Sequence, residues 1–308
     1  MTAPLDTLLA HADDAWAATC DCMALKPADA HTLTRQLIAA LEAPGVQSAP
    51  RGYTDLPAEF HVRASASMRD ARSPVSSRLL DLILVELIRE FDTRYHQAAL
   101  PESLLPYYRE NISRILSRAT QSGVWAGSSH DDIFLKDLGI LRMWLIPCAS
   151  HLVFRNSGVP RSLVLRQRPD ALIRALAFFA LRAGGFSPFL ENHVHPQMLV
   201  HFNPEGRQRC YELVAELLQR WPDSRGLMGL SWYYDPAVRT LSPRLAYLRN
   251  GPEQHGALFL PAGSGADVVG GATSTSVTRR TLYEAGAYMP TRYLMAWPRK
   301  DLLRLASP

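Results

Sequence analysis

The chain has few lysines, few cysteines and no long hydrophobic run. Its 308 residues include four cysteines and three lysines, Lys26, Lys136 and Lys300. Four cysteines are too few for a disulfide-rich scaffold, and Cys20-Asp-Cys22 lacks the second pair that a zinc ribbon needs. The composition therefore predicts a reduced protein whose fold depends on a hydrophobic core.

Membrane and secretion signals are also missing. The most apolar window, residues 79–88, is too short to span a bilayer and contains Asp81 and Glu86. The first residues carry early acidic groups and no basic segment, which argues against a signal peptide. We therefore expect a cytoplasmic protein that does not interact with a membrane.

Charge and motif content exclude several further classes. A net charge of +4 is small for 308 residues, and the arginines are spread along the chain. A nucleic-acid-binding protein usually concentrates its basic residues on one surface, so we expect no nucleic-acid partner. The sequence contains no Walker A motif and no G-x-S-x-G nucleophile motif. We expect a small-molecule substrate instead.

The order of the sequence patterns predicts an α/β fold with a mixed sheet, with α+β as the alternative. Residues 1–125 are helical in character, and 73–99 read as one long amphipathic helix. Strands and helices then alternate through residues 130–308, which predicts a second domain, with the boundary at 125–135. The expected strands are 140–147, 161–166, 198–202, 227–234, 257–261 and 292–297. The glycine-rich residues 262–272 are interpreted as a surface loop.

Histidines gather in the segment ENHVHPQMLVHF, residues 191–202. Alternate residues of an extended segment share a face, so Glu191, His193, His195 and His201 can face the same way. Two histidines and a carboxylate suit a non-haem iron or zinc site, whereas a single histidine suits acid–base catalysis near neutral pH. A structural role for these histidines is the third interpretation.

Another candidate site follows at NPEGRQR, residues 203–209. A helix that starts just after a strand presents free backbone N–H groups to an anion, and Gly206 would allow close backbone approach. Arg207 and Arg209 add positive charge. The strand, turn and helix resemble the pyrophosphate-binding turn of GNAT-type N-acyltransferases, and the resemblance extends over about residues 198–261. The family pattern places glycines after the basic residue, whereas Gly206 precedes Arg207 here.

The resemblance implies acyl transfer from a thioester, an acyl-CoA or an acyl-carrier thioester, to an amine. It implies that Gly206, Arg207 and Arg209 hold the donor phosphates. Asp235 follows an expected strand, where functional groups of open α/β sheets gather. We expect His195, His201 or Asp235 to accept the proton of the amine.

Two other classes of function remain open at this point. The first is a metal-dependent enzyme, with iron or zinc held by His193, His195 and either Glu191 or Asp235. The second is a non-catalytic interaction protein in which these polar residues fix loops.

Overall fold

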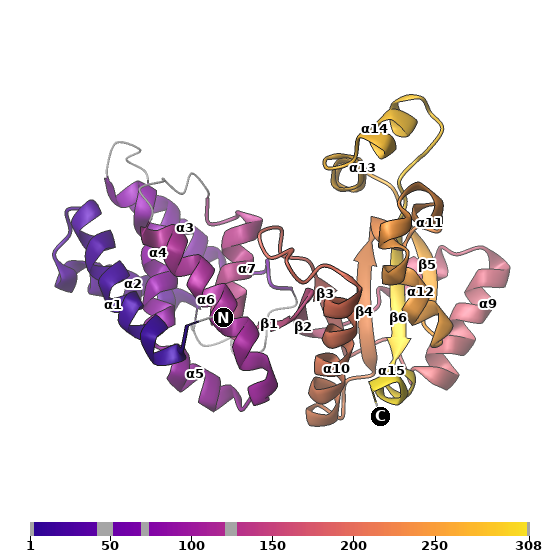
Figure 1. The fold of residues 1–308 in the computed structure, drawn as a ribbon, viewed down its shortest axis with the longest axis horizontal. Helices are drawn as coiled ribbons and strands as arrows, with labels where there is room; N and C mark the ends of the chain where they lie inside the picture. Colours follow the sequence, from indigo (N-terminus) through magenta and orange to yellow (C-terminus); the bar gives the residue numbers. More distant parts are fainter. Residues whose placement is uncertain (1–2, 42–51, 69–73, 121–127, 307–308) are drawn as a thin grey trace. The chain divides into compact units, whose positions relative to one another are not determined.

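The computed structural model describes residues 3–41, 52–68, 74–120 and 128–306. Its internal contacts divide the chain into two units (Figure 1). The first comprises Met1–Cys148 with His195–Leu199, and the second comprises Ala149–Val194 with Val200–Pro308. The division thus falls after Cys148, and a short later segment returns to the first unit.

The first unit is built from helices. They are α1 (Leu5–Cys22), α2 (Pro27–Leu41), α3 (Ala58–Ser67), α4 (Pro74–Arg89), α5 (Phe91–Ala98), η1 (Glu102–Leu104), α6 (Leu105–Thr120) and α7 (Asp132–Leu141), followed by strand β1 (Leu145–Cys148). α4 packs against α1, α2, α6 and α7, and its apolar side chains from Leu79 to Ile88 are buried. The expected single helix over 73–99 is wrong, because the helix is interrupted at Glu90 and continues as α5.

Two acidic residues that interrupt the apolar sequence of α4 are buried beside arginines. Asp81 contacts Arg118 of α6 at 3.3 Å. Glu86 accepts a hydrogen bond from Arg89 at 2.8 Å. Buried carboxylates are tolerated when they are paired in this way, which explains how charged residues fit inside an otherwise apolar helix.

The second unit carries most of the sheet. Its strands are β2 (His151–Ser157), β3 (Phe189–His193), β4 (Gly226–Ser231), β5 (Leu258–Gly263) and β6 (Arg292–Pro298). Its helices are α8 (Arg161–Leu165), α9 (Pro169–Ala177), α10 (Pro204–Arg220), α11 (Val238–Leu241), α12 (Tyr247–Gln254), α13 (Ala266–Thr273), α14 (Val277–Glu284) and α15 (Arg299–Ala306). Shorter helical turns are the π-helical η2 (Phe178–Arg182), η3 (Trp232–Tyr234) and η4 (Pro243–Leu245).

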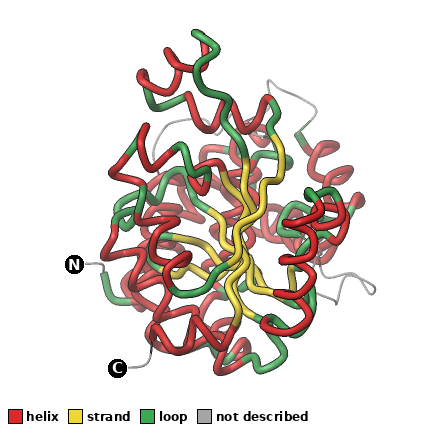
Figure 2. The backbone as a smooth tube through the Cα atoms, turned by 90° about the vertical axis from the view of Figure 1, so that its right-hand side faces the viewer, coloured by secondary structure: helices red, strands yellow, loops and turns green. Residues whose placement is uncertain are grey.

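The sheet order is β1-β2-β3-β4-β6-β5. β3 and β4 run parallel, whereas the pairs β2/β3, β4/β6 and β5/β6 are antiparallel. The strands twist along the sheet (Figure 2). The predicted mixed sheet of an α/β fold is confirmed.

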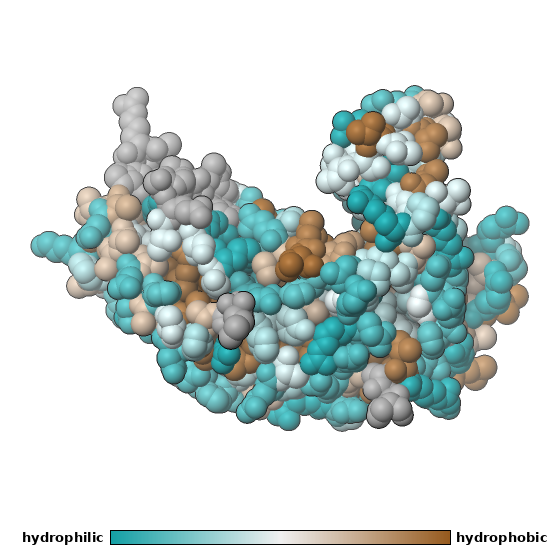
Figure 3. All heavy atoms as spheres, in the orientation of Figure 1, coloured by the Kyte–Doolittle hydropathy of each residue, from teal (hydrophilic) through white to brown (hydrophobic). Residues whose placement is uncertain are grey.

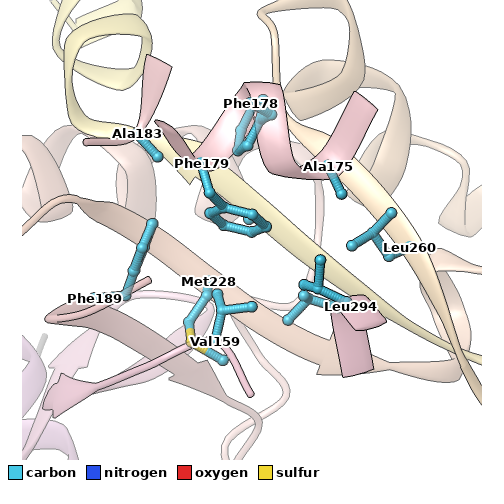
Figure 4. Packing of buried hydrophobic residues seen from close by; sticks show 11 residues of the cluster. Val159, Ala175, Phe178, Phe179, Ala183, Phe189, Met228, Leu260 and Leu294 are labelled. Atoms are coloured by element: carbon cyan, nitrogen blue, oxygen red, sulfur yellow. The ribbon is translucent and has the colours of Figure 1, made fainter. Parts of the chain in front are cut away.

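The core of the second unit lies between the sheet and the helix formed by α9 and η2. Phe178, Phe179 and Ala175 point from this helix toward Leu260 and Leu294 on the strands (Figure 4). Phe189, Met228 and Val159 complete the same cluster. On another side, α13 and α14 form an excursion between β5 and β6, beyond the carboxyl ends of β4 and β5 (Figure 1).

Several expected elements differ from the structure. Residues 161–165 form the helix α8, because a short apolar run after Pro160 is compatible with either a strand or one helical turn. No strand forms over 198–202, and the strand before α10 is β3. The expected loop 262–272 contains most of α13. Ile140 and Leu141 end α7, so that only 145–147 of the expected strand 140–147 lie in a strand, β1.

No helix in the parts of the chain that the structure describes combines the length and apolar character needed to cross a bilayer.

Candidate functional site

The parallel strands β3 and β4 part near their carboxyl ends. Their pairing covers only Leu190–Asn192 against Leu227–Gly229. β4 continues to Ser231 and stays paired with β6 over this extension. Beyond Gly229, the edge of β4 that faces β3 is therefore no longer paired with β3. An unmatched strand edge offers backbone N–H and C=O groups to another extended chain.

Beside this point lies a buried arginine. Arg207 occupies the apolar face of α10, in line with Cys210, Tyr211 and Val214 at helical spacing. Its side chain is 1% exposed. Nε donates to the Tyr211 hydroxyl at 2.7 Å, and Nη2 donates to the Tyr234 hydroxyl at 3.1 Å. The guanidinium also lies 4.7 Å from the centre of the Tyr211 ring, within cation–π range.

His151, the first residue of β2, is the third partner of the arginine. Arg207 Nη1 lies 2.8 Å from His151 Nδ1. A guanidinium can only donate, so Nδ1 must be unprotonated and the ring proton must sit on Nε2. Nε2 then donates to the Tyr233 hydroxyl at 3.2 Å. Burial lowers the pKa of His151 well below its usual value, and the positive charge of Arg207 lowers it further. The imidazole is therefore neutral.

Asn192 of β3 joins the same group at the last paired position of the strand. Of its two amide orientations, one satisfies both ends: the nitrogen donates to the Met228 carbonyl at 2.9 Å, and the oxygen accepts from Arg207 and from the Tyr234 hydroxyl at 3.1 Å. Opposite it, Gly229 leaves the necessary room, because a Cβ there would lie 1.7 Å from a terminal atom of the Asn192 side-chain amide. This polar group is called the Arg207 cluster; it comprises His151, Asn192, Arg207, Tyr211, Tyr233 and Tyr234.

The Arg207 cluster carries a net positive charge. Arg207 is paired with phenol hydroxyls, an imidazole and an amide, and none of the partners recorded for it in the described chain is a carboxylate. Burial raises the pKa of Tyr233 well above its usual value, so this phenol stays neutral. A buried charge acts over a longer range than an exposed one, because the surroundings screen it less.

Known proteins give the following comparisons. No family model and no curated protein matches the chain. Three solved structures align with 91–92% of it at 11–13% identity. They are an acyltransferase mutant with octanoyl-CoA (TM-score 0.45), an acyltransferase with decanoyl-CoA and teicoplanin (0.45) and an acyltransferase with CoA and 10C-teicoplanin (0.44), covered over 98–99% of their chains.

The residues expected to hold donor phosphates face different ways. The Gly206 N–H donates to the side chain of the N-cap residue Asn203 at 2.7 Å, and a Cβ on Gly206 would lie 2.1 Å from the His201 carbonyl oxygen. Gly206 thus serves the packing of the preceding loop. Arg207 points inward, whereas the partly exposed Arg209 pairs with Glu212 at 2.8 Å. The three residues do not converge on one external anion site.

The expected proton acceptors are also dispersed. His195 belongs to the first unit, where Nε2 lies 3.1 Å from Asp137 Oδ1 and Nδ1 accepts from the Gln197 N–H at 3.1 Å. Both ring nitrogens are therefore occupied. Asp235 is buried in the second unit and accepts from the backbone N–H groups of residues 237 and 291. His201 is partly exposed in the loop before α10.

The alternative metal ligands do not assemble. Glu191 Oε2 lies 3.7 Å from His193 Nε2 on β3 and accepts from the Ser157 hydroxyl at 2.6 Å. His195 and Asp235 have the separate partners given above. Within residues 3–41, 52–68, 74–120 and 128–306, no three His, Cys, Asp or Glu side chains are grouped so that they could hold a metal ion.

Sequence reasoning missed His151, Asn192 and the inward position of Arg207. One signal was available for Arg207, because its spacing to Cys210, Tyr211 and Val214 places it on the apolar stripe of the helix. His151 and Asn192 carry no such signal, since only the pairing of β2, β3 and β4 brings them beside the arginine.

Proposed function

We propose that this protein transfers an acyl group from a thioester donor, an acyl-CoA or an acyl-carrier thioester, to an amine. The observation that carries the proposal is the parting of β3 and β4 directly beside a buried cation. The resemblance of residues 198–261 to GNAT-type N-acyltransferases, with β3 in place of the strand expected over 198–202, supports the same reaction class.

The strand edge fits the donor. The arm of a CoA or carrier thioester is an extended chain with two amide groups, and such a chain can add to the unmatched edge of β4 in the manner of an extra strand. The thioester carbonyl would then lie near Asn192 and Gly229, the last paired residues of the two strands.

The buried cation fits the chemistry. When the amine nitrogen attacks the thioester carbon, negative charge develops on the carbonyl oxygen and then on the departing sulfur. A fixed positive charge held in a dry site stabilises both without reorganising during the reaction. Arg207 is held by hydroxyl, imidazole and amide groups, so its charge is not cancelled by an adjacent carboxylate. In this proposal Arg207 is a positioning and electrostatic residue and does not grip phosphates.

The amine must lose a proton when the new C–N bond forms and the C–S bond breaks. His201 is the proposed acceptor, because it is partly exposed beside the start of α10 and histidine is the side chain that most often serves as a general base. Both ring nitrogens of His195 are engaged, and the Asp235 carboxylate is buried and held by two backbone N–H groups. Arg209 remains the proposed surface contact for the donor phosphates.

The test combines binding and turnover. Purified full-length protein would be assayed for stabilisation by CoA in a thermal melt, and for release of free thiol from acyl-CoA thioesters of increasing chain length with a panel of primary amines. We expect CoA to raise Tm through preferential binding to the folded state. Absence of both stabilisation and amine-dependent thiol release would overturn the proposal.

A histidine pair separates the base from general effects. His201→Gln is expected to lower kcat by a factor of about 10²–10⁴ with little change in CoA stabilisation, as for loss of a general base. His96→Gln, at an exposed histidine of α5, is the matched control and should leave both unchanged. Equal activity of the two variants would remove His201 from the mechanism.

A further inference from the structure

Exposed apolar side chains concentrate on one part of the second unit. Nine large hydrophobic residues are exposed in the described chain. Four of them lie within 17 residues, on α8, α9 and η2: Leu165, Ile173, Leu176 and Leu181, the last 84% exposed. Scattered exposed apolar residues are ordinary, but a concentrated group marks an interaction surface.

The helix formed by α9 and η2 is apolar on two faces. Ala175, Phe178 and Phe179 point into the core (Figure 4). Ile173, Leu176 and Leu181 lie outward at steps of three and five residues, with exposed alanines at 177 and 180 between them. The wider π-helical turn, closed by the Ala183 N–H and the Phe178 carbonyl at 3.0 Å, lets the outward stripe include Leu181.

Arginines surround this apolar stripe. Residues 161–182 contain five arginines, all exposed, and one acidic residue, Asp170, so the local net charge is 5 − 1 = +4. Arg174 pairs with Asp170 at 3.4 Å, and Arg182 pairs with Asp301 at 2.7 Å. Arg166 and Arg168 have no acidic partner recorded among the described residues. The right-hand side of Figure 3, where Figure 1 draws α9, shows hydrophilic and hydrophobic residues side by side.

Two kinds of partner could cover an apolar helix face, a second copy of the chain or a lipid surface, and the positive charge of residues 161–182 favours one of them. A second copy of the chain would bring an equal positive charge against the first, which is unfavourable. An anionic lipid surface accepts apolar side chains below its headgroups and binds arginines at them.

We propose that the surface formed by residues 161–182, called the α9 face, docks on the surface of an anionic membrane. The helix would lie in the plane of the interface, with Ile173 and Leu181 inserted and the arginines at the phosphates. No membrane-spanning segment is needed for this arrangement, since the helix lies on the surface of the bilayer. The proposal is independent of acyl transfer.

Vesicle sedimentation tests the apolar part. Full-length protein would be mixed with vesicles of phosphatidylcholine alone or with about 30% phosphatidylglycerol. We expect sedimentation with the anionic vesicles only, and its loss in high salt because salt screens the arginines. The variant Ile173→Ser with Leu181→Ser should stay in the supernatant. Val62→Ser, at a similarly exposed apolar residue of α3, should sediment as the wild type does.

A charge pair tests the electrostatic part. Arg166→Gln with Arg168→Gln is expected to weaken partitioning roughly thirty-fold, since each arginine near an anionic surface contributes about fivefold. Arg220→Gln, at an exposed arginine of α10, is the control and should bind normally.

Two results would overturn the proposal. One is equal recovery of wild-type protein in the supernatant with both vesicle types. The other is a wild-type dimer in light scattering that the Ile173→Ser and Leu181→Ser variant abolishes, which would assign the α9 face to a second copy of the chain.

Discussion

Replacing Asp137 by asparagine should destabilise the first unit strongly. Asp137 of α7 is fully buried. Its carboxylate accepts hydrogen bonds from Arg118 Nη1 at 2.7 Å, from Arg114 Nη2 at short distance and from His195 Nε2 at 3.1 Å. These interactions lower the pKa of Asp137 below its usual value, against the opposing effect of burial. An asparagine keeps the shape but removes the charge, and its NH₂ group would face the arginine donors.

The magnitude follows from burial. Removing one partner of a buried ion pair costs about 3–5 kcal/mol, mainly because the remaining charge is left unpaired. Arg114 and Arg118 are partly exposed and can regain some hydration, so we expect the lower end, about 3 kcal/mol. In a unit of this size such a loss corresponds to roughly 6–12 °C in Tm.

Chemical denaturation monitored by circular dichroism would measure the free energy of unfolding. Glu59→Gln is the matched control, because Glu59 and its partner Arg63 on α3 of the same unit are 53% and 49% exposed. An exposed pair contributes about 1 kcal/mol or less. Stability of Asp137→Asn within about 1 kcal/mol of the wild type would refute the reasoning.

Three further predictions concern pH and packing. The depressed pKa of Asp137 contributes stability above about pH 4, and this contribution is lost as the pH falls further. Thermal melts below pH 4 should therefore show a smaller decrease in Tm with falling pH for Asp137→Asn than for the wild type. Burial and the neighbouring His130 lower the pKa of His61, so stability should fall as the pH drops below about 6.5; an identical pH dependence of Tm in His61→Gln would contradict this. Gly229→Ala should cost about 2 kcal/mol or more by overpacking against Asn192, and adding Asn192→Ala should recover part of the loss in urea denaturation.

Periodicity predicted the long helices well, because their buried faces repeat at three and four residues. The sequence predicts helices over 101–119 and 205–220, and α6 and α10 span Leu105–Thr120 and Pro204–Arg220. Short apolar runs carry no such information. Residues 161–166 and 198–202 were expected as strands, yet the first is a helical turn and the second is a loop in which Leu199 and Val200 are exposed. A short apolar run of this kind does not show which part of the protein it packs against, and that packing decides its conformation.

The candidate site was predictable only in part. The sequence placed the site near residues 191–209 and at the end of a strand, and the structure finds β3, α10 and Arg207 there. It did not reveal which side of α10 the arginine occupies, although the helical spacing to Tyr211 holds that information. The roles of His151 and Asn192 depend on strand pairing between distant segments, which local patterns do not encode.

The return of residues 195–199 to the first unit has a consequence for dissecting the protein. The chain passes from one unit to the other three times, after residues 148, 194 and 199. A fragment that starts at residue 149 would therefore keep His195 and Gln197 but lose Asp137 and Arg114, to which these side chains bond. Neither unit is a contiguous piece of sequence, so a ribosome releases the end of the first unit only after it has made part of the second.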